Sequence, residues 1–266
     1  MWKSIYKSEP GTSHLVSRQP CQDFGAAVSV RTAEGVVLLA ACADGAGSAE
    51  HSEIGSKLAV EHFLNHTQAY FDQGGSLGDY EDLSLRYRMV SARAAIYEEA
   101  TTLGVAPRSL ACTILAAVVG ENFAIFSQIG DGVIVYDEGD SYSSVMWPDS
   151  GEYANTTRFL TDTNALDYLR TVRIDRRIDD LALMTDGLQM LALNFADRSV
   201  HAPFFQPLFK VLKASETIDG LVPKLGEFLN SDRVNSRTDD DKTLILATRE
   251  RVSVDGSPTD SASPTV

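Results

Sequence analysis

Cysteine is scarce in this chain. The 266 residues include three cysteines, Cys21, Cys42 and Cys112, and the last two lie inside apolar runs. An odd number this small argues against the disulfide framework of a small secreted domain. We therefore expect reduced thiols, buried in the core of a cytoplasmic protein.

Long apolar runs are absent as well. The best is Val36–Ala43, whereas a helix that crosses a membrane needs about 18 or more apolar residues in succession. The first residues, MWKSIYKSEPGTSH, lack the apolar stretch of a secretory signal peptide. The sequence thus predicts a protein without a membrane-spanning helix and without a membrane partner.

Cations are few, since 23 Lys and Arg residues face 37 Asp and Glu residues and give a formal net charge of −14. Because general binders of nucleic acid or of anionic membranes need basic patches, we expect neither partner. Hydrophobic residues make up 44% of the chain, which is enough for a large core. The length fits one domain, which we place at residues 1–250. Residues 251–266 are rich in Ser, Thr and Pro and are predicted to be a disordered tail.

Apolar runs that end at turn residues predict the strands. They are Trp2–Ser8, Phe24–Val30, Val36–Ala43, Ala111–Val119, Phe123–Ile129, Val133–Tyr136, Leu181–Thr185 and Thr243–Thr248. The fourth and fifth are expected to form a hairpin, which the sixth continues as a meander.

Three helices are predicted between the strand groups. One apolar stripe marks a long helix that ends near Gly104, and it consists of Leu83, Tyr87, Val90, Ala94, Tyr97 and Thr101. Glu53–Asn65 is a second helix, and Leu221, Leu225, Phe228 and Leu229 mark a third. Two successive helices between hairpin-linked strands favour an α+β fold with antiparallel sheets flanked by helices.

Five aspartates lie at the ends of these strands. Asp44, Asp131 and Asp186 each follow an apolar strand and precede a glycine, whereas Asp23 and Asp240 stand just before a strand. Asp-Gly is a common turn, which explains any one site by itself. It explains all five less well, because no basic residues stand beside them to neutralise the cluster. Hard oxygen ligands suit Mg²⁺ or Mn²⁺, and two such ions about 4 Å apart activate water and clamp a phosphate.

Other site chemistries find weaker support. His51-Ser52-Glu53 is similar to the start of a zinc deaminase motif, but no Pro-Cys-x-x-Cys follows. Gly45-Ala46-Gly47 lacks the third glycine of a dinucleotide loop and the lysine of a P-loop.

The aspartates belong to short motifs in a fixed order: Arg18-Gln-Pro-Cys-Gln-Asp23, Ala43-Asp44-Gly45-Ala46-Gly47, Gly130-Asp131-Gly132, Thr185-Asp186-Gly187-Leu188 and Asp240-Asp241-Lys242-Thr243. In order, spacing and strand-end placement this set resembles the protein phosphatase 2C family of metal-dependent serine/threonine phosphatases. Gly11-Thr-Ser-His14 and Gly151-Glu-Tyr-Ala-Asn-Thr156 look like a bacterial, YegK-like branch. The resemblance implies a four-layer α-β-β-α sandwich of two antiparallel sheets flanked by helix pairs.

The resemblance also implies a role for each site residue. Asp44 is similar to the aspartate that bridges two metals, and Gly45 to the glycine that offers its carbonyl. Asp186 and Asp240 look like ligands of the first metal, and Asp23 like the acid that serves the second. Asp131 looks like the acid that, with Asp186, holds a third and weaker metal. Arg18 matches the arginine that grips the substrate phosphate through a planar fork. The implied cofactors are two Mn²⁺ or Mg²⁺ ions, with the third as an addition.

The sequence departs from the family pattern at three positions, one of which affects the proton donor. Cys21 stands for the usual Asn, Gly132 for the usual Ser, and Ala46 for a histidine that donates a proton in some members. The leaving-group proton would then come from metal-bound water or another acid. His14 is a candidate contact to phosphate or leaving group, although a histidine that orders the first turn explains it equally well. In the segment Tyr142–Thr161, Gly and Pro mix with large aromatic residues, which favours a flap beside the site over an ordinary long loop.

The first hypothesis for function is therefore a metal-dependent phosphatase that hydrolyses phosphoserine and phosphothreonine through metal-activated water. Phosphorylated proteins would be its substrates, and a cognate serine/threonine kinase its functional opposite. One alternative is a catalytically silent relative that binds a kinase or phosphoprotein as a scaffold. Another is a two-metal phosphoesterase that acts on a small metabolite or nucleotide.

Overall fold

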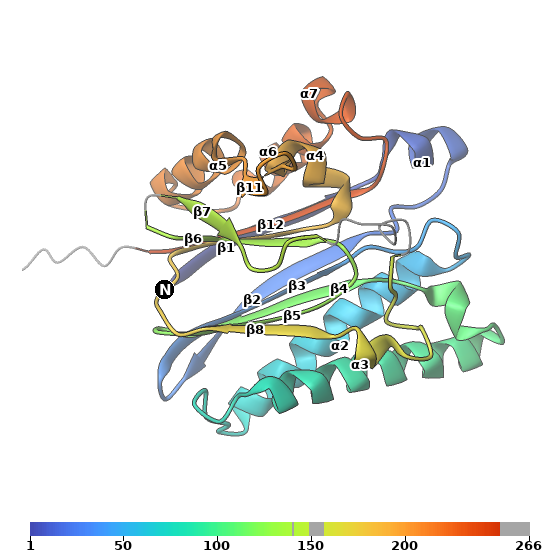
Figure 1. The fold of residues 1–266 in the computed structure, drawn as a ribbon, viewed down its shortest axis with the longest axis horizontal. Coiled ribbons are helices and arrows are strands. Elements are labelled where there is room, and N and C mark those ends of the chain that lie inside the picture. Colours follow the sequence, from blue (N-terminus) through green and yellow to red (C-terminus); the bar gives the residue numbers. More distant parts are fainter. Residues whose placement is uncertain (140, 149–156, 251–266) are drawn as a thin grey trace, which may run out of the picture.

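Two antiparallel sheets pack face to face and carry helices on their outer faces in the computed structural model, which describes residues 1–139, 141–148 and 157–250 (Figure 1). The predicted α+β four-layer sandwich is confirmed. The predicted tail, 251–266, and the middle of the predicted flap lie outside the described residues. Among the described helices, none is long and apolar enough to cross a membrane.

Sheet I has the strand order β2-β3-β4-β5-β8. Its strands are β2 (Phe24–Thr32), β3 (Gly35–Ala43), β4 (Ile114–Val119), β5 (Ala124–Ile129) and β8 (Arg170–Ile174). Two long helices, α2 (Ser52–Asp72) and α3 (Asp82–Leu103), cover its outer face (Figure 1). Both lie between β3 and β4 in the chain, so the connection between these two strands supplies both long helices of this layer.

Sheet II has the order β1-β12-β9-β6-β7. Its strands are β1 (Trp2–Glu9), β6 (Val133–Asp137), β7 (Tyr142–Ser144), β9 (Asp180–Met184) and β12 (Lys242–Arg249). Helices α5 (Ala202–Ala214) and α6 (Leu221–Leu229) cover its outer face (Figure 1). The shorter elements are α1 (Thr12–Ser17), η1 (Pro107–Leu110), η2 (Ala165–Asp167), η3 (Asp186–Leu188), α4 (Gln189–Ala192), β10 (Leu193–Asn194), β11 (Ser199–Val200) and α7 (Asp232–Asn235).

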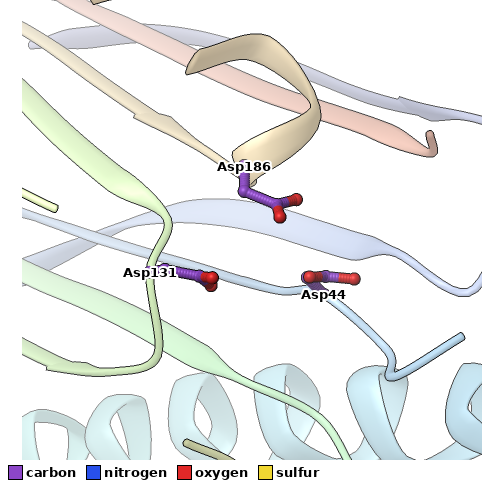
Figure 2. Close-up of side chains that lie close together, drawn as sticks. All are labelled: Asp44, Asp131 and Asp186. Carbon is purple, nitrogen blue, oxygen red and sulfur yellow. The ribbon is translucent and has the colours of Figure 1, made fainter. Parts of the chain in front are cut away.

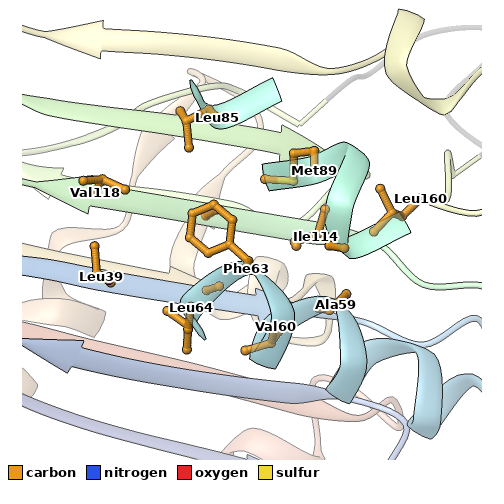
Figure 3. Packing of buried hydrophobic residues seen from close by; sticks show 14 of the residues in the cluster. Leu39, Ala59, Val60, Phe63, Leu64, Leu85, Met89, Ile114, Val118 and Leu160 are labelled. Carbon is orange, nitrogen blue, oxygen red and sulfur yellow. The ribbon is translucent and has the colours of Figure 1, made fainter. Parts of the chain in front are cut away.

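The continuous apolar run of β3 is explained by burial on both faces. Leu38, Ala40 and Cys42 point into the layer between the two sheets. The alternate residues, among them Leu39, pack under α2 and α3 with Phe63 (Figure 3). Because successive side chains of a strand point to opposite faces, a strand between two apolar layers needs no polar side.

The predicted meander at β6 is wrong. The chain leaves sheet I after β5, and β6 pairs with β9 and β7 in sheet II. The turn Gly130-Asp131-Gly132 is thus a crossing between sheets, and Gly130 adopts a positive φ of 109° there. A hairpin and a crossing both need glycine, so the local sequence does not distinguish them.

The predicted face of α3 is also wrong, although the helix itself is confirmed. Leu83 and Tyr87, from the predicted stripe, are 76% and 61% exposed. The residues that pack against sheet I form a different stripe: Leu85, Met89, Ala92, Ile96 and Ala100. Elements α1, β7, β8 and α5 were not predicted from the sequence, and β4 begins at Ile114 rather than at the predicted Ala111.

The three thiols are free, as expected; Cys42 and Cys112 are buried, and Cys21 is half-buried. Cys112 lies before β4 and forms an isolated bridge with Gly45, which ties the loop after β3 to the start of the β4–β5 hairpin.

Candidate metal centre

Three of the predicted ligands meet where strands from both sheets end. Asp44 follows β3, Asp131 lies in the crossing from β5 to β6, and Asp186 follows β9. One carboxylate oxygen from each lies within 4.8 Å of the others, and the three side chains point toward a common centre (Figure 2). Carboxylates this close repel one another unless protons or cations lie between them.

Asp23 lies at the edge of this group through the pairing of β2 with β3. Phe24 pairs with Ala43, so the residues beside them, Asp23 and Asp44, come from adjacent strands. The hydroxyl of Thr185 donates a hydrogen bond of 2.6 Å to Asp23 Oδ2, and the side chain of Asp23 is buried. Asp240 lies outside the 4.8 Å group, and its residue is exposed.

Two carboxylate oxygens in this site are buried without a hydrogen-bond partner in the described part of the chain. They are Asp23 Oδ1 and Asp131 Oδ1. A buried anionic oxygen without a donor is costly, and a hard cation would satisfy it. The donor set, which consists of carboxylates close together at strand ends, therefore fits Mg²⁺ or Mn²⁺.

The acidity of the group changes in the direction that crowding predicts. Burial above all raises the pKa of Asp23 to about 8, although the hydrogen bond from Thr185 opposes the shift. Burial, followed by repulsion from Asp131 and Asp240, raises the pKa of Asp186 to about 7. Burial and then repulsion from Asp23 raise the pKa of Asp44 well above its usual value. Without a cation, the folded chain thus holds protons that the unfolded chain has released.

This difference predicts how the stability of the metal-free protein depends on pH. The pKa values of Asp23 and Asp186 are raised in the folded state, so their contribution to stability is lost as the pH rises toward 8. The free energy of unfolding should fall by about 1.4 kcal/mol per pH unit for each proton that only the folded state holds. Urea unfolding in EDTA at pH 5.5, 7 and 8.5 measures this slope, and a flat or rising profile would contradict it. Added Mn²⁺ at pH 8.5 should restore the stability.

The loop that carries Asp131 is fixed from both sides. The side-chain amide of Gln128 donates to the carbonyls of Gly130, at 3.0 Å, and Gly132, at 2.8 Å. A side chain at Gly132 would lie 2.7 Å from the carbonyl oxygen of Met184, so the departure from the family's Ser has a steric reason in this chain. The hydroxyl of Thr157 donates to Asp131 Oδ2 at 2.8 Å, so the end of the predicted flap segment contacts the site.

The loop that carries Asp44 is equally constrained. The amide of Asp44 donates to Thr113 Oγ1 at 2.9 Å, and the amide of Thr113 donates to the carbonyl of Asp44 at 2.8 Å. Gly45 is buried, and a Cβ there would lie 2.6 Å from the carbonyl oxygen of Gln22. Glycine is therefore required by packing at the position where the predicted carbonyl ligand stands.

His14 is brought to this end of the molecule by Asp241. Its Nδ1 lies 2.8 Å from Asp241 Oδ1, and the same oxygen accepts the amide of Gly11 at 2.6 Å. Asp241 Oδ2 accepts the amide of Gln22, also at 2.6 Å. One buried carboxylate thus fixes the turn before α1 and the residue before Asp23. The predicted role of His14 in ordering the first turn is supported by this contact, which leaves its Nε2 for another partner.

Arg18 ends α1 with an exposed side chain and a left-handed backbone, at φ 58°. Such a conformation is uncommon for a residue other than glycine and costs of order 1 kcal/mol or more. Among the described residues, no acidic side chain forms an ion pair with the guanidinium, and no hydrogen bond joins Arg18 to the aspartates.

Gly11 permits the close approach between α1 and the loop before β12. A Cβ on Gly11 would lie 2.2 Å from the carbonyl oxygen of Asp239. Gly11→Ala should therefore displace α1 and lower stability by about 1–3 kcal/mol, the usual cost of overpacking, together with activity. Thermal unfolding measures the stability. The control is Gly220→Ala, where a Cβ meets nothing within 4 Å, and which should be neutral or slightly stabilising. Equal behaviour of the two variants would contradict the prediction.

Sequence reasoning missed the residues that support the aspartates. Asp241 and Thr185 stand within the quoted motifs but were given no role, and Gln128 stands in a strand sequence without a motif. A signal was present at Thr185, since a polar residue between an apolar strand and Asp186 needs a buried partner. The partner, Asp23, is 162 residues away.

Comparisons with known proteins agree with this geometry. The family profile described as "Protein phosphatase 2C" matches residues 10–230, which include four of the five aspartates but not Asp240. The chain is 40% identical over 255 residues to "Serine/threonine-protein phosphatase 3" of Escherichia coli K12, an alignment that covers 92% of this chain and 98% of the relative.

Solved structures of low sequence identity share the fold. A crystal structure of a bacterial serine phosphatase matches with a TM-score of 0.64 at 17% identity, over 96% of this chain and all of that one. The phosphatase Stp1 from Staphylococcus aureus matches with a TM-score of 0.61 at 16% identity, over 94% of this chain and 96% of that one. From the family profile and the 40% identical relative, it follows that this chain belongs to the protein phosphatase 2C family.

Proposed function

We propose that this protein is a metal-dependent serine/threonine protein phosphatase of the cytoplasm, with phosphorylated proteins as substrates and a serine/threonine kinase as its opposite. The observation that carries the proposal is the convergence of Asp44, Asp131 and Asp186 at the ends of strands from both sheets. Unsatisfied buried oxygens on Asp23 and Asp131 support cation binding at the same place. The E. coli relative, named as a serine/threonine-protein phosphatase, supports the substrate class.

Two Mn²⁺ or Mg²⁺ ions are proposed to share Asp44, with the carbonyl of Gly45 beside them. Asp186 and Asp240 would complete the first position and Asp23 the second, while Asp131 with Asp186 would hold a third ion. When bound, the ions supply an activated water and offset the negative charge of the phosphoryl oxygens. Repulsion from Asp240 contributes to the raised pKa of Asp186, which supports placing that exposed carboxylate near the group.

Arg18 is proposed to bind the phosphoryl oxygens of the substrate. Its exposed guanidinium forms no ion pair in the described part of the chain, and its strained backbone is held at the end of α1. A guanidinium presents parallel N–H donors that match two phosphoryl oxygens. It would orient the ester for in-line attack without any covalent intermediate.

His14 is proposed to deliver the leaving-group proton. Asp241 holds Nδ1 and thereby fixes the orientation of the ring, which leaves Nε2 as the atom that can reach a substrate oxygen. In a protonated imidazole, the Nε2 proton would pass to the serine or threonine oxygen as the bond to phosphorus breaks. His14 would then replace the histidine that some family members carry where this chain has Ala46.

Turnover of phosphopeptides tests the proposal. The protein should release phosphate from phosphoserine and phosphothreonine peptides when Mn²⁺ or Mg²⁺ is present, and EDTA should abolish the release. Turnover in EDTA would reject the mechanism. Binding of Mn²⁺ and of phosphopeptide without turnover would favour the scaffold, and faster turnover of small phosphate esters would favour a metabolite phosphoesterase.

A further inference from the structure

A cavity lies at the opposite end of sheet II from the aspartates. It has a volume of about 720 Å³ and is bounded by the C-terminal half of α5, the end of β12 and the residues before β9. β9 runs from Asp180 beside the cavity to Met184, two residues before Asp186. At about 3.3 Å per residue, a strand of this length separates the cavity from the metal centre by roughly 15 Å or more. We call it the α5 cavity.

Cations are concentrated on the α5 cavity, although the chain as a whole is strongly acidic. Two acidic residues, Asp179 and Glu250, line the cavity. Five basic residues line it as well: Lys3, Arg177, Lys210, Lys213 and Arg249. The whole chain has 23 basic residues and a net charge of −14. Two further carboxylates pair with lining cations, Glu121 with both arginines and Asp180 with Lys213, so the excess positive charge rests mainly on Lys3 and Lys210. A concave surface with an excess of one sign of charge attracts ligands of the other sign.

The two arginines are already paired, and both contact Glu121, whose carboxylate offsets their charge. Arg177 Nε donates to Asp179 Oδ1 at 2.7 Å. Arg249 is buried, donates to the carbonyl of Ile178 at 2.7 Å, and stacks over the ring of Trp2. Neither side chain can turn toward a ligand without breaking these contacts.

The three lysines keep donors for a ligand. Lys3 Nζ donates to the carbonyl of Ser215 at 2.6 Å, and Lys213 Nζ donates to Asp180 Oδ2 at 2.5 Å. Lys210 is exposed and pairs with no carboxylate in the part of the chain that the structure describes. Since each ammonium carries three N–H groups, at least two remain on each lysine. Lys210 and Lys213 are three residues apart on α5, so they lie on one face of the helix.

An aromatic wall completes the α5 cavity. Tyr142 and Phe209 both line it, and their rings stack with centroids 5.5 Å apart. Phe209 is 1% exposed, so the half-buried ring of Tyr142 carries the surface that a ligand can touch. The hydroxyl of Tyr142 donates to Asp180 Oδ2, so the ring is fixed in place. A volume of this size, with an apolar wall and a few convergent polar groups, is typical of small-molecule sites.

We propose that the α5 cavity binds a small organic polyanion with adjacent phosphate groups, of the size of a nucleoside triphosphate. Lys3, Lys210 and Lys213 would contact the phosphate oxygens, and the ring of Tyr142, with Phe209 packed behind it, would contact the apolar part. This ligand would be distinct from the phosphoester substrate, because it binds a strand length away from the aspartates.

Calorimetry in EDTA tests the site, because the metal-free aspartates repel anions and cannot bind the probe. ATP and inorganic tripolyphosphate are each titrated into the full chain. The wild-type chain should bind one equivalent, and the double variant Lys3→Gln/Lys210→Gln should bind at least about 10-fold more weakly, as expected for lost charge-assisted hydrogen bonds. The control, Lys57→Gln/Lys224→Gln, removes the same charge outside the cavity and should bind within about twofold of wild type.

The outcomes separate the site from general charge effects. No saturable binding by the wild type, or equal weakening in the two double variants, would overturn the proposal. Tighter binding of ATP than of tripolyphosphate supports it with a nucleoside contact at the aromatic wall. Equal binding supports it with the phosphate chain as the recognised group.

Discussion

Asp44→Asn should abolish phosphatase activity, with a loss of at least about 10³-fold in kcat at saturating Mn²⁺. The side chain lies within 4.8 Å of Asp131 and Asp186, so it borders every proposed ion position, and loss of one anionic oxygen weakens each of them. A loss of this size is on the scale that follows removal of a key electrostatic group from an active site. Phosphopeptide turnover with a Mn²⁺ titration measures it.

The same substitution should make the metal-free protein more stable. Asp44 is repelled by Asp23, Asp186, Asp240 and Asp131, and a neutral amide removes this repulsion. Urea unfolding in EDTA at pH 8 measures the gain. Asp79→Asn, at an exposed position away from the cluster, removes the same charge and should change neither property. A nearly wild-type rate for Asp44→Asn would show that the shared position is assigned wrongly.

Arg18→Ala should lower kcat/KM by roughly 10- to 150-fold without a change in Mn²⁺ affinity. The range corresponds to loss of a charge-assisted hydrogen-bonded fork worth roughly 1.5–3 kcal/mol. Arg18→Lys should recover only part of the loss, because an ammonium cannot make the bidentate contact. A phosphopeptide saturation curve and a Mn²⁺ titration on the same variant separate substrate binding from metal binding.

Arg31→Ala is the matched control for Arg18. Arg31 is also exposed, but it lies near the far end of β2 from Asp23, and its removal should leave the kinetics unchanged. If Arg18→Ala is equally silent, Arg18 does not contact the substrate. His14 would then be the next candidate for the phosphate contact.

The sequence was sufficient to point to Asp44, Asp131 and Asp186 because each one is marked locally. Asp44 and Asp186 stand where an apolar strand stops and a glycine follows, and both facts lie within a few residues. The strand ends then had to converge, which the sandwich architecture ensures. Asp241 could not be recognised in this way, because its partners Gly11, His14 and Gln22 lie more than 200 residues away.

The orientation of α3 was predicted wrongly for a related reason. The helix carries two apolar stripes, one through Leu83 and Tyr87 and one through Leu85 and Met89. Periodicity predicts a helix from either stripe, but only the surface of sheet I decides between them. The stripe through Leu85 and Met89 is the buried one. Its side chains are smaller on average, because alanines alternate with Met89 and Ile96 where the helix crosses the sheet. The crossing at Gly130–Gly132 likewise depended on a partner strand, β9, that comes about 50 residues later in the chain.

Because β1 pairs with β12, the first strand of the chain can join sheet II only after the last strand has been synthesised. β1 is an edge strand whose partner in sheet II is β12, and Asp241, just before β12, fixes the segment that carries His14. A nascent chain grows by about 5–20 residues per second, so β12 is synthesised on the order of tens of seconds after β1. Until then, the proposed phosphate and proton groups have no fixed position relative to the aspartates. Incomplete chains on the ribosome would therefore be inactive toward cellular phosphoproteins, although four of the five aspartates have already been made.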